Sequence, residues 1–150
     1  MISVEYIRQE GRRVRGLCAG HYDIRKYAAV LEEEYSGAYR VETEGMRGLP
    51  HKISPSDACK LASKLAALLH VKRLKQIILN SAVAYGCAGA YENGAIHFPD
   101  EAIFTATFLH EFGHHVCYVE RWRIGHGKEY CEALELVFQA AHVVYNNKLS

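Results

Sequence analysis

The chain has 150 residues, of which 49% are hydrophobic and 23% are charged, proportions typical of one globular domain with a sizeable core. Its 18 Lys and Arg against 17 Asp and Glu give a formal net charge of +1. The chain as a whole therefore has no large excess of positive charge that would attract nucleic acid or an anionic membrane. The N-terminus lacks an apolar signal-peptide core, no apolar run reaches membrane-spanning length, and the five scattered cysteines include no C-x-x-C pair. We therefore expect a cytoplasmic protein with reduced thiols, one domain over residues 1–150 and a motif-bearing core over about residues 54–146.

The first third of the chain shows only weak local patterns. Alternating apolar and polar residues predict strands over residues 2–7 and 39–43, and helical spacing predicts a helix over residues 23–35. A basic cluster before this helix is interpreted as a solvated loop; it consists of Arg8, Arg12, Arg13 and Arg15. None of these patterns carries a chemical motif.

A capped amphipathic helix is predicted to begin after residue 54. Ser54 can accept the capping hydrogen bond, Pro55 suits the first helical position, and Asp57 favours the first turn. An apolar stripe predicts core packing and consists of Ala58, Leu61, Ala62, Leu65, Leu68 and Leu69. Beyond this helix, residues 76–79 are a candidate buried strand.

Two strand-like runs follow, over residues 85–92 and 95–98, and Asn93-Gly94 joins them. Asn-Gly between such runs predicts a two-residue hairpin. Pro99 and Asp100 then predict the start of another helix, with Asp100 as its cap. The apolar residues of this helix keep helical spacing; they are Ile103, Phe104, Phe108, Leu109 and Phe112.

This predicted helix carries the motif H-E-x-x-H at residues 110–114. His110 and His114 are four residues apart, so on a helix their side chains meet on one face and can bind one metal ion, most often zinc. Glu111 lies beside them, where a carboxylate can take a proton from a metal-bound water and pass it to a leaving amine. Gly113 is small enough to let another element approach this site.

A third candidate ligand follows the helix. His126 lies between two glycines, which allow a tight turn, and a catalytic zinc usually has three protein ligands and an open position for water. Glu129 and Glu132 are rivals for the third position, because a carboxylate on the next helix could serve equally. That final helix is predicted over residues 128–146, with Leu134, Val137, Phe138, Ala141 and Val144 facing inward.

The residues 110–115, H-E-F-G-H-H, followed by H-G-K-E-Y at residues 126–130, resemble the SprT-like and related small zinc metallopeptidases of the minigluzincin type. The resemblance covers roughly the last two-fifths of the chain, from about Gly86 onward. It implies an α+β, zincin-like single domain with a short, mostly antiparallel sheet packed on the active-site helix. It also implies Zn²⁺ held by His110, His114 and His126, with Glu111 as the catalytic residue.

The same resemblance suggests how a substrate is bound. In many zincins an edge strand lines the cleft and pairs with an extended peptide, which makes residues 95–98 the candidate edge. His97 is then a candidate substrate-binding residue, although an ordinary strand histidine fits the sequence too. Tyr130 is a second candidate, either as an electrophilic tyrosine or as a core aromatic. His115 points off the ligand face and is assigned no catalytic role.

Together these patterns predict a zinc metallopeptidase that acts on a peptide or protein substrate. One alternative is a repressor-cleaving metallopeptidase whose third ligand is Glu129, Glu132 or Glu135. Another is a non-enzymatic, zinc-stabilised structural or interaction protein of a phage or mobile element. Four protein ligands around the metal would favour the structural role, whereas an open coordination position would favour the enzyme.

Overall fold

The computed structural model describes residues 37–121 and 126–147. The predicted strand over residues 2–7, the basic cluster over residues 8–15 and the predicted helix over residues 23–35 lie outside the described residues. The described elements are β1 Lys52–Ile53, α3 Pro55–Leu69, β2 Gln76–Ile78, the 3₁₀ turn η1 Ala82–Ala84, β3 Ala90–Glu92, β4 Ala95–His97, β5 Ile103–Phe104, α4 Thr105–Arg121 and α5 Lys128–Asn146. Residues 37–45 are helical as well.

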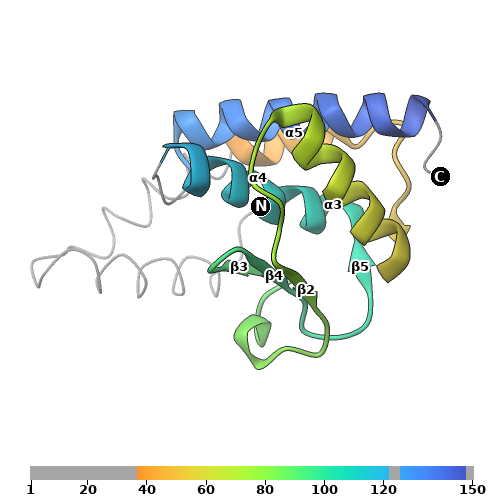
Figure 1. Cartoon of the computed structure of the whole chain (residues 1–150), viewed down its shortest axis with the longest axis vertical. Coiled ribbons are helices and arrows are strands. Elements are labelled where there is room, and N and C mark those ends of the chain that lie inside the picture. The colour runs from red at the N-terminus through yellow and green to blue at the C-terminus, as the bar shows by residue number, and fades with distance from the viewer. Residues whose placement is uncertain (1–36, 122–125, 148–150) are drawn as a thin grey trace, which may run out of the picture.

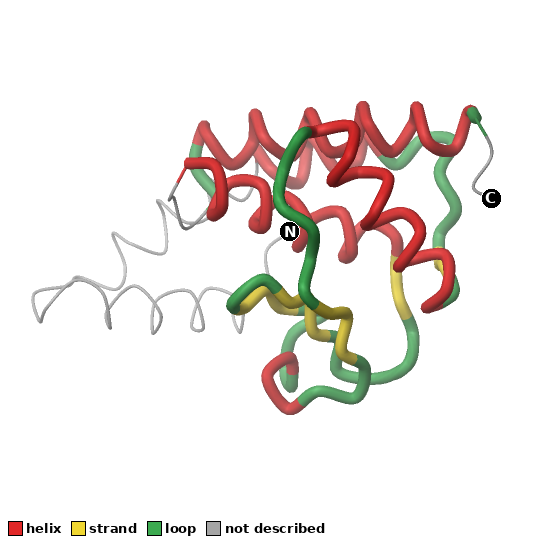
Figure 2. The backbone as a smooth tube through the Cα atoms, viewed as in Figure 1, coloured by secondary structure: helices red, strands yellow, loops and turns green. Residues whose placement is uncertain are grey.

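The helices form one layer and the strands lie on one side of it, an α+β arrangement (Figures 1 and 2). In Figure 1, α5 and α4 run beside each other, and α3 crosses in front of them. The inner faces of these helices share one hydrophobic core, which also includes Ile96 on the central strand β4 and Phe98 just after it. Among the helices of the described ranges, none is long and apolar enough to cross a membrane.

Helix α3 confirms its predicted start. The backbone N–H of Asp57 donates to Ser54 Oγ at 3.1 Å, and Pro55 takes the first helical position, where its missing N–H costs nothing. The predicted stripe is buried up to Leu65, but Leu68 is 46% exposed. Leu69 is partly buried and packs against the core, and the helix ends at His70, which has a left-handed conformation with φ 54°.

The three-stranded sheet has the order β2-β4-β3. Asn93 and Gly94 have φ angles of 51° and 81° and join β3 to β4 as an antiparallel hairpin, which confirms the predicted turn. The prediction that residues 95–98 form an edge is wrong, because β4 pairs on its other side with β2, in parallel. This three-stranded sheet is therefore mixed, with one parallel and one antiparallel pairing, whereas β1 and β5 pair antiparallel. Strand β2 is half-exposed rather than buried, since it lies at the edge of this sheet.

One further prediction is corrected by pairing between distant segments. The helix that carries the histidines begins at Thr105 and not at Asp100, because Ile103 pairs with Ile53 to form the strands β5 and β1. The Asp100 carboxylate instead closes a turn by accepting the N–H of Ala102 at 2.9 Å.

Residues 39–43 are helical rather than extended. This first described helix docks on α5: a Cβ added to Gly45 would lie 2.5 Å from the ring of Phe138, and His142 Nε2 donates to the Gly45 carbonyl at 2.7 Å. Five alternating residues are too short a pattern to outweigh such tertiary packing.

Helix α5 spans the predicted residues, and its five predicted inward residues are all buried. It approaches α4 closely at Gly113, where an added Cβ would lie 3.1 Å from both Leu134 Cδ1 and Tyr130 Cε2. A larger residue at this position would push the two helices apart. The prediction that Gly113 admits a neighbouring element is therefore confirmed.

Candidate metal centre

Three histidines converge at the junction of α4 and α5. His110 and His114 lie one turn apart on α4, with ring centroids 5.1 Å apart, and His126 precedes α5. The Nε2 atom of His126 lies 3.0 Å from Nε2 of His110 and 3.1 Å from Nε2 of His114. The three residues lie close enough to bind one metal ion, with all donor atoms within 4.8 Å of one another.

These distances suit a metal ion. Two nitrogens each about 2.0–2.1 Å from one zinc at a tetrahedral angle stand about 3.3 Å apart, close to the separations observed here. A proton on His126 Nε2 could serve only one of its two nitrogen neighbours, whereas a cation attracts the lone pairs of all three. The donor set, three imidazoles, is one that zinc, copper, iron and nickel share.

Burial keeps His126 in the form that binds metals. Its side chain is 1% exposed, and this desolvation lowers its pKa from 6.5 to about 3. The ring is therefore neutral at physiological pH and offers a lone pair without first losing a proton.

The other ring nitrogen of His110 is held by a residue that the sequence did not identify. Glu42 Oε1, from the helix over residues 37–45, accepts a hydrogen bond from His110 Nδ1. A carboxylate in this place fixes the tautomer with Nε2 unprotonated, orients the ring and makes it a stronger ligand. The general need for such a partner is predictable, but 68 residues separate the two, and no local pattern shows which carboxylate supplies it.

Glu111 lies at the edge of the histidine group. Its side chain is largely buried, and its Oε1 stands 3.9 Å from His110 Nε2. The backbone at Gly89 passes over it, since an added Cβ there would lie 3.5 Å from Glu111 Cγ and 2.8 Å from Thr107 Cγ2. The carboxylate is thus placed on the same side of α4 as the ligand nitrogens, where it can reach a water bound there.

The ring of Tyr130 packs against the rings of the three histidines. Tyr130 is 2% exposed, its ring stacks on His114 at 4.4 Å between centroids, and its hydroxyl donates to the His110 carbonyl at 2.8 Å. Because the hydroxyl is engaged with the backbone, this geometry favours a core aromatic over an electrophilic or substrate-binding tyrosine.

His97 lies on the central strand β4 and is not part of the three-histidine group. Its side chain is buried, and its Nδ1 is hydrogen-bonded to Ser81 Oγ at 2.7 Å. This contact ties the sheet to the loop before η1 and favours a structural role over substrate binding.

His115 also joins separate elements. Its Nδ1 lies 2.8 Å from the Tyr91 hydroxyl on β3, and its Nε2 contacts the Lys72 carbonyl. The ring is 1% exposed and points away from the ligand face, as its position one residue after His114 predicts.

The rival ligands lie elsewhere within the described structure. Glu129, Glu132 and Glu135 on α5 are not in the metal-binding group, and Glu132 and Glu135 are exposed. Cys117 is buried in the core and is likewise outside the group. The four described cysteines are thiols, namely Cys59, Cys87, Cys117 and Cys131, and Cys18 lies outside the described residues.

Comparison of the chain with protein-family models, with curated proteins and with solved structures finds no match.

Proposed function

We propose that this protein is a zinc-dependent peptidase with a zincin-like active site, similar in its histidine motifs to the SprT-like metallopeptidases. The observation that carries the proposal is the convergence of three imidazole Nε2 atoms, with a buried carboxylate beside them on the same helix. His110, His114 and His126 would hold the ion. When bound, zinc supplies a Lewis acid that lowers the pKa of a coordinated water from 15.7 to about 7.

The remaining chemistry comes from the side chains of the chain itself. Glu111 accepts the proton of the attacking water and then delivers it to the leaving amine of the cleaved peptide bond. Burial of Glu111 under the backbone at Gly89 limits its movement and strengthens its electrostatic influence. Glu42 holds the His110 ring, and Tyr130 holds the backbone of His110 and the ring of His114.

The donor set distinguishes the candidate sites. Among the described residues, the metal-binding group consists of three histidines, His110, His114 and His126. Structural zinc sites are almost always closed by four protein ligands, whereas catalytic sites keep one position for water or substrate. The third histidine favours this proposal over a repressor-cleaving site with a glutamate ligand.

The test is hydrolysis by the purified full-length chain. It is incubated with a denatured protein and with a proteome-derived peptide library, before and after treatment with a chelator, and then with added Zn²⁺. We expect new peptide termini that disappear with chelation and return with zinc. Metal analysis that finds one zinc bound by four protein side chains, together with no cleavage, would overturn the proposal.

A further inference from the structure

Positive charge is concentrated in one part of this nearly neutral chain. Five of its 18 Lys and Arg, and none of its 17 Asp and Glu, lie between Ala58 and Tyr91; they are Lys60, Lys64, Lys72, Arg73 and Lys75. All five are at least partly exposed. Among the described residues no carboxylate forms an ion pair with Arg73 or Lys75. This segment is therefore a local site of attraction for anionic groups.

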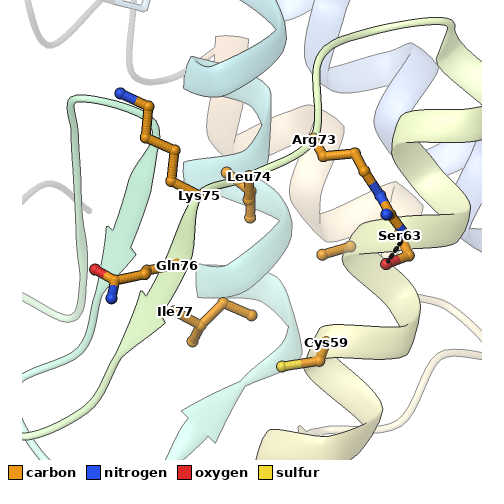
Figure 3. Close-up of a pocket in the computed structure, with 8 residues that line it drawn as sticks. Cys59, Ser63, Arg73, Leu74, Lys75, Gln76 and Ile77 are labelled. Atoms are coloured by element: carbon orange, nitrogen blue, oxygen red, sulfur yellow. Dashed lines mark hydrogen bonds between the residues drawn. The ribbon is translucent and has the colours of Figure 1, made fainter.

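A groove lies within this basic segment, between α3 and β2 (Figure 3). It has a volume of about 290 Å³ and is lined by Cys59, Ala62 and Ser63 from α3 and by residues 73–77. Figure 3 shows Arg73 reaching across to α3, where its Nη2 donates to Ser63 Oγ at 3.1 Å. Cys59 and Ile77 face the space between the two elements, and Arg73 lies at one end of it, whereas the Lys75 side chain points away from α3 and lies against Gly94. The groove therefore joins an apolar interior to the Arg73 guanidinium.

One wall of the groove is a sheet edge. Strand β2 has β4 on one side, and no strand of the described ranges pairs with its other side. The carbonyl of Ile78 accepts the N–H of Phe98 at 2.8 Å and so faces β4. Because backbone groups alternate along a parallel ladder, the N–H and carbonyl of Ile77 face the outer edge, where an extended peptide can pair with them.

The loop that leads into this groove contacts the helix that carries the histidines. The carbonyl of Lys72, at the start of the loop that carries Arg73 and Lys75, contacts His115 Nε2 on α4. His115 directly follows His114 in the chain. The loop at one end of the groove is therefore held against α4, the helix that bears His110 and His114.

We propose that the groove between α3 and β2 is a docking site for an acidic, extended segment of the protein substrate. This inference rests on the proposed peptidase function and names a feature of its substrate. A peptide is favoured over a nucleic acid because the lining contains a backbone edge and aliphatic side chains but no aromatic ring on which a base could stack.

The experiment measures binding without cleavage. Full-length protein carrying Glu111→Gln is titrated into a fluorescent decapeptide of alternating Glu and Val, and into the same peptide with Gln in place of Glu. Fluorescence anisotropy should show binding of the Glu peptide and at least about tenfold weaker binding of the Gln peptide, since several exposed charge pairs are lost. Equal binding of the two peptides would overturn the charge requirement.

Three variants locate the site. Arg73→Glu should weaken binding by about tenfold or more, because an attraction becomes a repulsion. Cys59→Trp fills the groove without changing charge and should also weaken binding, whereas Arg47→Glu is a matched charge reversal on an exposed residue outside the groove and should not. Unchanged binding in folded Cys59→Trp would overturn the site.

An oligothymidine of ten nucleotides separates a peptide site from a general polyanion site. If it displaces the Glu peptide at equal concentration, the peptide assignment fails. Because binding is measured in the Glu111→Gln background, these outcomes are independent of whether the protein hydrolyses peptides.

Discussion

Each ring nitrogen of His110 has a defined neighbour: Nε2 faces His126, and Nδ1 donates to Glu42. His114 and His126 contribute their Nε2 atoms to the same point, and Tyr130 packs against all three rings. The direct donors and their immediate supports thus come from three separate segments of the chain. Substituting them one at a time separates chemistry from metal binding.

Glu111→Gln should keep the fold and the metal and remove most hydrolysis. The amide has nearly the same shape as the carboxylate but cannot accept the proton of the attacking water. We expect the cleavage rate to fall by a factor on the order of 10²–10⁴. The rate is measured at matched zinc content; an active, zinc-loaded Glu111→Gln protein would exclude Glu111 as the general base.

His126→Ala should weaken zinc binding far more than Glu129→Ala or Glu132→Ala. His126 Nε2 lies within 3.1 Å of both other ligand nitrogens, whereas the two glutamates are outside the metal-binding group. Loss of a direct ligand should exceed the 10–100-fold effect typical of a residue that only supports a ligand. A competition titration against a chromophoric chelator at pH 7 ranks the zinc affinities of the three variants. A larger loss of zinc affinity in either glutamate variant would show that the third ligand is a glutamate of α5.

Some of this site was predictable and some was not. The i, i+4 spacing of His110 and His114 requires only that the segment be helical, and a Gly-flanked His126 shortly after it is a local signal too. Glu42 has no such signal, because its position depends on how the helix over residues 37–45 docks on α5. The substrate-binding role predicted for His97 depends on β4 being an edge strand, and the pairing of β4 with β2 removes that reason.

The helices and strands also divide into those that a local sequence pattern predicts and those that depend on contacts between distant segments. Helices α3 and α5 were predictable because each has a long apolar stripe, and α3 also has the Ser54 cap. The hairpin was predictable from Asn93-Gly94 between two strand-like runs. Strands β1 and β5 have two residues each and exist through their pairing with each other, so no pattern within either one indicates them.

The helix over residues 37–45 is the element on which the Glu42 contact depends. A Cβ at Gly45 would lie 2.5 Å from Cγ of Phe138, next to the α5 backbone, where little movement is possible. We predict that Gly45→Ala lowers the free energy of unfolding by about 1–3 kcal/mol and also weakens zinc binding. Glu44→Ala, an exposed change in the same helix, is the control, and both quantities are measured by urea unfolding and chelator competition.

Glu42→Gln tests the contact itself without disturbing the packing. The amide can still accept a hydrogen bond from His110 Nδ1 but carries no charge. Zinc affinity should fall by about 10–100-fold while the unfolding midpoint of the metal-free protein stays close to that of the parent. Unchanged affinity would show that Glu42 has no influence on the metal.

The stability of the whole metal-free protein should depend on pH through His126. Its pKa is about 3 when folded and 6.5 in the unfolded chain, so below pH 6.5 the unfolded state binds a proton that the folded state does not. Its contribution to stability is therefore constant above pH 6.5 and is lost as the pH falls toward 3, with a slope of up to about 1.4 kcal/mol per pH unit.

The measurement is urea unfolding with a chelator present, between pH 7.5 and 4, for the parent and for His126→Asn. The chelator removes the separate pH dependence of metal binding. The parent should lose stability across this range more steeply than the variant. Parallel curves would mean that His126 titrates normally in the folded protein.

The spacing of the site residues along the chain has a consequence for the order in which the protein folds. His114 and His126 are separated by 12 residues, whereas Glu42 and His110 are separated by 68. Closing the longer loop costs about 1.5 kcal/mol more chain entropy than closing the shorter one. We therefore expect metal binding to join α4 and α5 early in folding. The helix over residues 37–45 then docks on α5, and Glu42 binds His110 and strengthens metal binding. Stopped-flow refolding in which zinc uptake lags behind the docking of that helix would contradict this order.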